Sequence, residues 1–148
     1  MDEPFKKQPI YWQSECILEA KPRGFHLIND ELNKNLAAMP TITTGLIHFF
    51  LKHTSASLTI SENTCADVAK DLEQFFTRKI PDDLSLYRHI LEGADDMPAH
   101  IKNVVLGVSL TIPLQNGQMA LGQWQGIFLA EHRNQASARQ IVITAHGY

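Results

Sequence analysis

The chain has 148 residues, of which 44% are hydrophobic and 20% are charged, and its formal net charge is -3. These values are typical of one ordinary globular domain, so we expect residues 1–148 to form a single domain. A net negative charge gives no electrostatic reason to expect nucleic acid or an acidic membrane surface as a partner.

The cysteines and the N-terminus indicate the compartment. Cys16 and Cys65 are too few for a disulfide framework, and neither belongs to a CxxC pair. The opening residues MDEPFKKQPI lack an apolar signal region, and the apolar stretches are far shorter than the roughly 18 residues that a membrane span needs. We therefore expect a cytoplasmic protein that does not enter a membrane.

In the first part of the chain, short strand-like segments alternate with polar turns. Residues 11–20 and 24–28 predict strands on either side of the turn KPRG. Asp30 is suited to cap a helix that Pro40 ends. Residues 45–60 are rich in β-branched and aromatic side chains and predict two strands with a polar break between them.

A second helix is expected after Thr64, which with Asp67 resembles a capping box. Its apolar residues recur at helical spacing and predict a buried face: Val68, Leu72, Phe75 and Phe76.

The last part of the chain reads as one helix and then a run of strands. The helix is expected to begin at Pro98 and to stop at Gly107. Asn-Gly at 116–117 follows alternating apolar residues and is a strong hairpin signal, and residues 124–132 and 139–147 predict two further strands. Mixed strands and helices with a hairpin-rich end favour an α+β fold, with a largely antiparallel sheet and a few packed helices, over a doubly wound one.

Four histidines lie at or near the boundaries of these elements: His53, His89, His100 and His132. Side-chain alternation places His53 and His132 at the ends of apolar rows on their strands. Carboxylates and amides accompany the four histidines, namely Glu62, Asn63, Glu92, Asp95, Asp96 and Glu131. Imidazoles with carboxylates are the ligands of zinc and other divalent ions, so a metal site is one interpretation.

Each of these residues also has a purely structural interpretation. A single histidine at a strand end is more often half-buried than a ligand, and Asp95 and Asp96 can simply stabilise the start of a helix. Arg133 suits a phosphate or carboxylate contact but fits an exposed strand end equally well. Trp124 is expected in the core. The chain has no GxGxxG, GxxxxGK[ST] or GxSxG motif, so phosphate loops and serine nucleophile elbows are not expected.

Longer motifs resemble a known family. In order, HTSASLTISEN, EGADDMPAHIK, GVSLTIPLQNGQMALGQWQGIFLAEHR and ARQIVITAHG are similar to the YjbQ family, from about RGFH to the C-terminus. Two positions depart from the family pattern: Gln123 stands in GQWQ where the family usually reads GTWQ, and His146 precedes Gly147 where the family often has Gln.

The resemblance implies an α+β domain that forms a homotrimer, with a polar pocket of histidines and, in some members, a bound metal ion. It also implies a weak secondary thiamine-phosphate synthase activity, which joins a pyrimidine diphosphate to a thiazole phosphate, with an undefined primary role. The family motif positions fall on His53, Glu62, Asn63, His89, Glu92, Asp96, His100, Trp124, His132 and Arg133.

From these positions we expect a divalent ion, zinc or magnesium, bound by residues among His53, His89, His100 and His132. Catalytic or substrate-binding roles are expected for Glu62, Asn63, Asp96 and Arg133. Three protein ligands are expected rather than four, because a catalytic ion keeps an open position. The substrate would be a small phosphorylated molecule. Two alternatives remain open: a metal-dependent hydrolase or lyase of a small metabolite, and a non-catalytic trimeric ligand-binding module.

Overall fold

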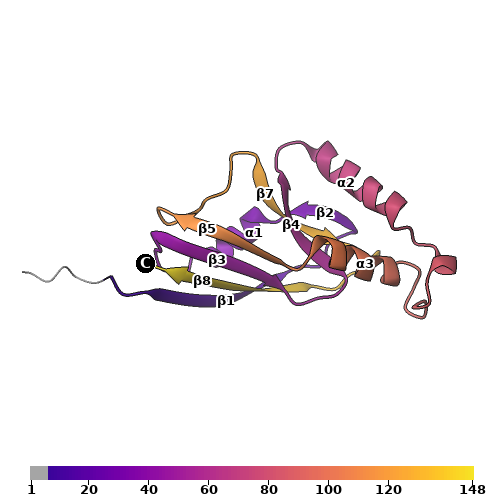
Figure 1. Cartoon of the computed structure of the whole chain (residues 1–148), viewed down its shortest axis with the longest axis horizontal. Coiled ribbons are helices and arrows are strands. Elements are labelled where there is room, and N and C mark those ends of the chain that lie inside the picture. The colour runs from indigo at the N-terminus through magenta and orange to yellow at the C-terminus, as the bar shows by residue number, and fades with distance from the viewer. Residues whose placement is uncertain (1–6) are drawn as a thin grey trace, which may run out of the picture.

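The computed structural model describes residues 7–148, which fold into two antiparallel sheets and three α-helices (Figure 1). The larger sheet has the strand order β1-β8-β3-β5-β6, and the smaller one has the order β2-β7-β4. The strands are β1 Ile10–Leu18, β2 Gly24–Leu27, β3 Thr44–Leu51, β4 Ala56–Glu62, β5 Ser109–Gln115, β6 Gln118–Met119, β7 Gln125–Glu131 and β8 Arg139–Gly147. The helices are α1 Asn29–Leu36, α2 Ala66–Lys79 and α3 Asp96–Leu106, with a short 3-10 turn, η1, at Leu84–Leu86.

The main core lies on the inner face of the larger sheet, against the smaller one. On β3, Ile47, Phe49 and Leu51 are buried and alternate with more exposed residues, because successive side chains of a strand point to opposite faces. The same alternation on β8 buries Ile141 and Ile143. Every strand pair is antiparallel within the described residues, and the predicted α+β fold is confirmed.

Strand β7 is buried on both faces. It lies between β2 and β4, so both of its edges are paired. One face joins the main core through Ile127 and Leu129, and the other forms a second cluster through Phe128 and Ala130. Helices α2 and α3 cover this second face (Figure 1).

Local signals located several element ends well. The hairpin at 116–117 is confirmed, and both residues have the positive φ (51° and 80°) that Asn and Gly tolerate best. Gly107 ends α3 with φ of 91°, as predicted. Pro98, however, is the third residue of α3 rather than the first, because Asp96 and Met97 already form helix. Helix α1 ends at Leu36, before Pro40.

Two predictions of burial are wrong. The apolar stripe of α2 is only half covered: no α2 residue is fully buried, and Phe75 is 47% exposed. Trp124, expected in the core, is 58% exposed, because it lies in the loop before β7 rather than in the strand.

The outer face of the larger sheet is not covered by other elements within residues 7–148. Register places Tyr11, His146 and Leu46 in one row across β1, β8 and β3, and Val142 and Phe50 in another. Tyr11, Leu46 and Phe50 are all exposed. No described helix is both long and apolar enough to cross a membrane.

Candidate functional site

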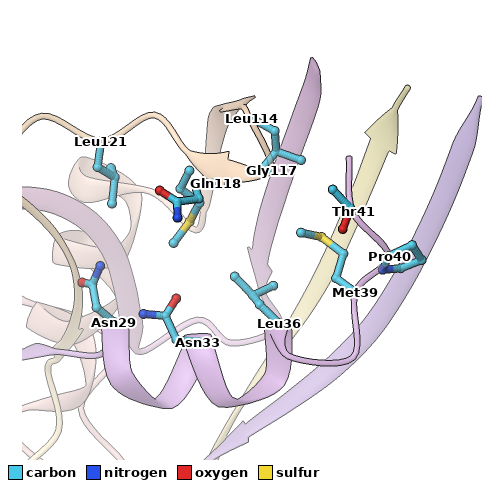
Figure 2. A pocket seen from close by; sticks show the side chains of 11 residues that line it. Asn29, Asn33, Leu36, Met39, Pro40, Thr41, Leu114, Gly117, Gln118 and Leu121 are labelled. Atoms are coloured by element: carbon cyan, nitrogen blue, oxygen red, sulfur yellow. The ribbon is translucent and has the colours of Figure 1, made fainter. Parts of the chain in front are cut away.

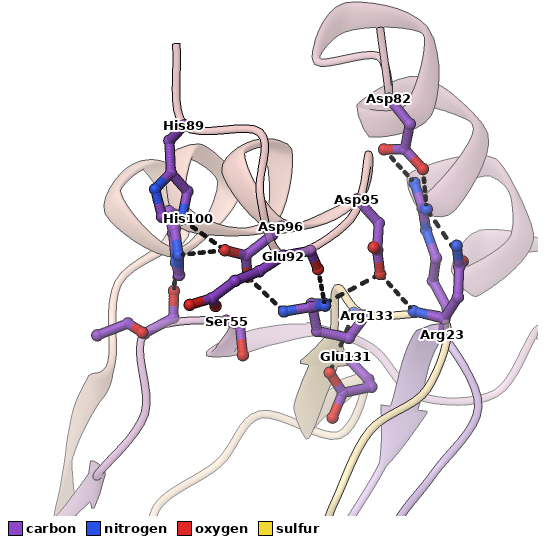
Figure 3. A network of polar contacts seen from close by, with 12 residues as sticks. Arg23, Ser55, Asp82, His89, Glu92, Asp95, Asp96, His100, Glu131 and Arg133 are labelled. Carbon is purple, nitrogen blue, oxygen red and sulfur yellow. Dashed lines mark hydrogen bonds and ion pairs between the residues drawn. The ribbon is translucent and has the colours of Figure 1, made fainter. Parts of the chain in front are cut away.

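Two histidines and an aspartate converge at the start of α3 (Figure 3). Asp96 is the first residue of α3, and His100 follows one turn later on the same face. His89 approaches from the preceding loop. Asp96 Oδ2 lies 2.6 Å from His89 Nε2 and 3.2 Å from His100 Nε2. The three ligand atoms lie within 4.8 Å of one another, close enough to share one ion.

The backbone determines the proton position on His100. Its Nδ1 lies 2.8 Å from the carbonyl oxygen of Thr54, and a carbonyl can only accept, so Nδ1 carries the proton. In the neutral ring, Nε2 therefore has a free lone pair, and this lone pair faces the Asp96 carboxylate. Two electron-pair donors so close need a cation between them or a second proton on the ring. The hydrogen bond from His100 Nδ1 to the Thr54 carbonyl is of the kind that orients metal-binding histidines.

Arg133 fixes the orientation of Asp96. Its Nη1 donates to Asp96 Oδ1, its Nε donates to Asp95 Oδ2 at 3.0 Å, and its Nη2 donates to the carbonyl of Glu92 at 2.9 Å (Figure 3). Arg133, which follows β7, therefore connects that strand to the start of α3 and to the loop before it. With Oδ1 occupied, Asp96 presents Oδ2 to His89 and His100. Burial tends to raise the pKa of Asp96, but the hydrogen bond from His89 and nearby positive charge hold it below its ordinary value.

His53 and His132 lie outside this group. His53 Nε2 accepts the backbone N–H of Gln140 at 2.8 Å, which occupies that lone pair. Burial, with the charge of Arg139, lowers the pKa of His53. His132 is 1% exposed, and its Nε2 lies 2.9 Å from the hydroxyl of Ser57.

Glu62 and Asn63 lie at the other end of the smaller sheet. β4 runs from Ala56, near His132, to Glu62, a span of about 20 Å for seven residues. Glu62 accepts the hydroxyl of Thr64 and the N–H groups of Cys65 and Thr64, and these hydrogen bonds lower its pKa. Asn63 binds the loop before β7. In one chain, Glu62 and Asn63 therefore lie apart from the His89, Asp96 and His100 cluster.

Sequence reasoning did not single out Lys102, which is 1% exposed. Its Nζ and the Nδ1 of His132 are buried without a hydrogen-bond partner in residues 7–148. Burial and the charge of Arg23 lower the pKa of Lys102. The spacing of Asp95, Ala99 and Lys102 on one helix face is the signal that could have revealed it.

The family profile described as "UPF0047 protein YjbQ-like" matches residues 14–148. The chain belongs to the YjbQ/UPF0047 family. Among YjbQ/UPF0047 relatives, it is 49% identical over 138 residues to the UPF0047 protein YjbQ of Salmonella typhimurium, covering 93% of this chain and 99% of that one. It is 39% identical to a UPF0047 protein of Synechocystis, with 91% of each chain covered.

Solved structures have the same fold. A YbjQ-like protein of unknown function from Sulfolobus solfataricus superimposes with a TM-score of 0.84 at 20% identity, covering 95% of this chain and all of that one. A conserved hypothetical protein from Thermus thermophilus gives 0.75 at 30% identity, covering 88% and 97%. The prediction of a YjbQ-like α+β domain is thus confirmed.

Proposed function

We propose that His89, Asp96 and His100 bind a divalent metal ion with which the protein acts on a small phosphorylated substrate. The observation that carries this proposal is the His100 ring, whose proton is held on Nδ1 by the Thr54 carbonyl while Nε2 faces a carboxylate. Two imidazole nitrogens with one carboxylate oxygen favour zinc over magnesium, because magnesium prefers oxygen ligands and keeps much of its water.

The surroundings of the cluster leave room for a substrate. A cleft of about 320 Å³, lined by Thr54, His100, Asn103 and Val104, opens beside the cluster. Three protein ligands leave coordination positions free for another molecule. A divalent ion there would stabilise negative charge on a phosphate or diphosphate group. Arg133 would hold Asp96 in place, and the Thr54 carbonyl would keep the His100 ring oriented.

The reaction to test first is thiamine-phosphate synthesis from a pyrimidine diphosphate and a thiazole phosphate. Family resemblance supports it, and the cluster suits it because a diphosphate leaving group needs cationic help. A metal-dependent hydrolase or lyase of a small phosphorylated metabolite is the second candidate, since the same three ligands would serve it. A non-catalytic ligand-binding module is the third.

Metal binding is the first test. Zinc titrated into the untagged, chelator-treated protein is expected to bind at about one ion per chain. His100→Ala should weaken binding at least about 100-fold, because it removes one of three ligands. His53→Ala is the matched control and should bind as wild type does, because His53 Nε2 is already occupied. Equal binding by wild type and His100→Ala would refute the proposed site.

Turnover separates the three candidates. The zinc-loaded protein would be assayed with the two thiamine precursors and with a panel of phosphorylated metabolites, in parallel with His100→Ala. Synthase activity lost in the variant supports the first candidate, and phosphate release lost in the variant supports the second. Ligand-dependent stabilisation without turnover would point to the binding module.

We further propose that the protein assembles as a homotrimer in the cytoplasm. The family resemblance supports this assembly. The uncovered outer face of the larger sheet offers an apolar surface that suits a contact between subunits, since Tyr11, Leu46 and Phe50 lie on it.

Phe50→Glu should reduce the assembly to monomers at micromolar concentration, because it places a charge on this face, on the central strand of the sheet. Phe50 is 43% exposed in the single chain, so the change should not disturb the fold. Sedimentation velocity of the wild type and of Phe50→Glu would measure the mass of each assembly. Phe75→Glu, an equally exposed phenylalanine on α2, is the control and should leave the mass unchanged. A Phe50→Glu protein of unchanged mass would exclude this face.

A further inference from the structure

A cleft of about 420 Å³ lies between helix α1, the segment that follows it and the β5–β6 hairpin (Figure 2). Its volume is within the range of small-molecule sites, roughly 300–1,000 Å³. None of its lining residues belongs to the His89, Asp96 and His100 cluster. It is therefore a separate concave surface.

The polar side chains of the cleft are three amides and the hydroxyl of Thr41. Figure 2 shows the amides of Asn29, Asn33 and Gln118 facing the same space, two from α1 and one from β6. The Asn29 carbonyl oxygen accepts the N–H of Ile127 at 2.7 Å, which fixes that side chain and leaves its NH2 group available. Within residues 7–148, the Asn33 and Gln118 amides make no side-chain hydrogen bond. Among residues 7–148, no charged residue lines the cleft.

Apolar side chains form the rest of the wall. Leu36 and Met39 lie on the α1 side, and Met119 and Leu121 lie opposite. Methionine adapts to irregular shapes and makes favourable contacts with aromatic rings. Apolar walls with unpaired amides suit a flat, uncharged ring that has hydrogen-bond donors and acceptors along its edge.

One wall is held in place by the motif residue Asn63. Its Nδ2 donates to the carbonyls of Gln123 and Gln125, and Gln125 Oε1 accepts the N–H of Gly122 at 2.8 Å. These bonds fix the loop that carries Leu121. A pre-formed wall lowers the entropic cost of binding a ligand.

Gly126 brings Asn63 beside Asn29. A Cβ at Gly126 would lie 2.9 Å from the Asn63 Cβ, 3.5 Å from Asn29 Oδ1 and 2.4 Å from Leu27 Cδ1. The missing side chain therefore lets Asn63 pack against the β7 backbone next to the cleft. Asn63 and the GQWQ loop at 122–125 therefore both lie beside this cleft, and the proposed metal cluster uses neither of them.

We infer that this cleft is a second ligand site, which binds an uncharged nitrogen heterocycle of nucleobase type through the amides of Asn29, Asn33 and Gln118. The ring edge pairs with the Asn33 and Gln118 amides, each of which offers a donor and an acceptor side by side, and accepts from the NH2 group of Asn29. The ring faces contact the leucine and methionine side chains. This site does not depend on the proposed metal.

The test is binding of adenosine, cytidine, uridine and inosine, measured by calorimetry on the full chain in the presence of a chelator. At least one is expected to bind the wild type. Asn33→Leu and Gln118→Leu should each weaken that binding at least about tenfold. Both residues are exposed, so neither change should prevent folding. Gln74→Leu on α2, an equally exposed glutamine outside the cleft, is the control and should bind as wild type does.

Three outcomes would overturn the inference. In the first, none of the four nucleosides binds. In the second, a nucleoside binds and both cleft variants bind it as wild type does. In the third, His100→Ala loses the binding while the cleft variants retain it. The last result would place the ligand at the metal cluster instead. Because the measurement is made without metal, failure of the metal proposal leaves its outcome unchanged.

Discussion

Lowering the pH from 7.5 to 5.0 should reduce the free energy of unfolding, and His132 alone should contribute up to about 1.4 kcal/mol per pH unit below pH 6.5. His132 is 1% exposed, and burial together with the charge of Lys102 lowers its pKa to about 3. The ring is therefore neutral in the folded protein at every pH in this range.

The direction follows from proton counting. In the unfolded chain, His132 titrates near pH 6.5, so between pH 6.5 and about 3 the unfolded state binds a proton that the folded state does not. Stability therefore falls as the pH falls through this window and is unaffected above it. His53, whose pKa is also lowered, acts in the same direction.

Urea unfolding at half-unit pH steps, in the presence of a chelator, would measure this slope. His132→Gln should flatten the curve between pH 6.5 and 5.0, because it removes the titrating group and keeps a polar atom near Ser57. Lys102→Met should leave the slope between pH 6.5 and 5.0 largely unchanged, because burial is the main cause that keeps folded His132 neutral. If His132→Gln has the same slope as wild type, the acid sensitivity comes from other groups.

The fold could be predicted largely from the sequence because its signals are local. Alternation in β3 and β8, the Asn-Gly turn at 116–117 and Gly107 each act over a few residues. The failures concern contacts between distant segments. Helical spacing predicted the apolar stripe of α2, but the number of elements that cover it depends on the tertiary fold, and Phe75 stays exposed.

The candidate site was predicted less completely for the same reason. The i, i+4 spacing of Asp96 and His100 is visible in the sequence, but the Thr54 carbonyl that fixes the His100 proton is not. Side-chain parity placed His53 and His132 at strand ends without showing which ends meet. The pairing of β4 with β7 separates Glu62 from His132, and only the pairing reveals this.

The buried pair of Glu131 and Arg139 links stability to the geometry of the His89, Asp96 and His100 cluster. Arg139 donates from Nε and Nη2 to the two carboxylate oxygens at 2.7 and 2.6 Å, and both side chains are almost fully buried. Nη2 also reaches the carbonyl and hydroxyl of Ser55. Ser55 adjoins Thr54, so Arg139 supports the turn whose carbonyl orients His100.

Arg139→Met should destabilise the protein by about 3–5 kcal/mol, because it leaves the Glu131 carboxylate buried without its partner. The double variant Glu131→Leu/Arg139→Met should recover most of this loss, since apolar residues can replace a buried ion pair at little cost. Urea unfolding of the chelator-treated proteins measures both changes.

Zinc affinity should behave differently from stability in the same two variants. The double variant still lacks the contact to Ser55, so its affinity should stay about 10–100-fold below that of wild type, as for the loss of other groups that orient a ligand. Recovery of both stability and zinc affinity in the double variant would show that Arg139 acts only through the charge of Glu131. Recovery of stability alone would show that zinc binding also needs the polar contacts of this pair, those of Arg139 to Ser55 beside Thr54 and that of Glu131 to the N–H of Arg133.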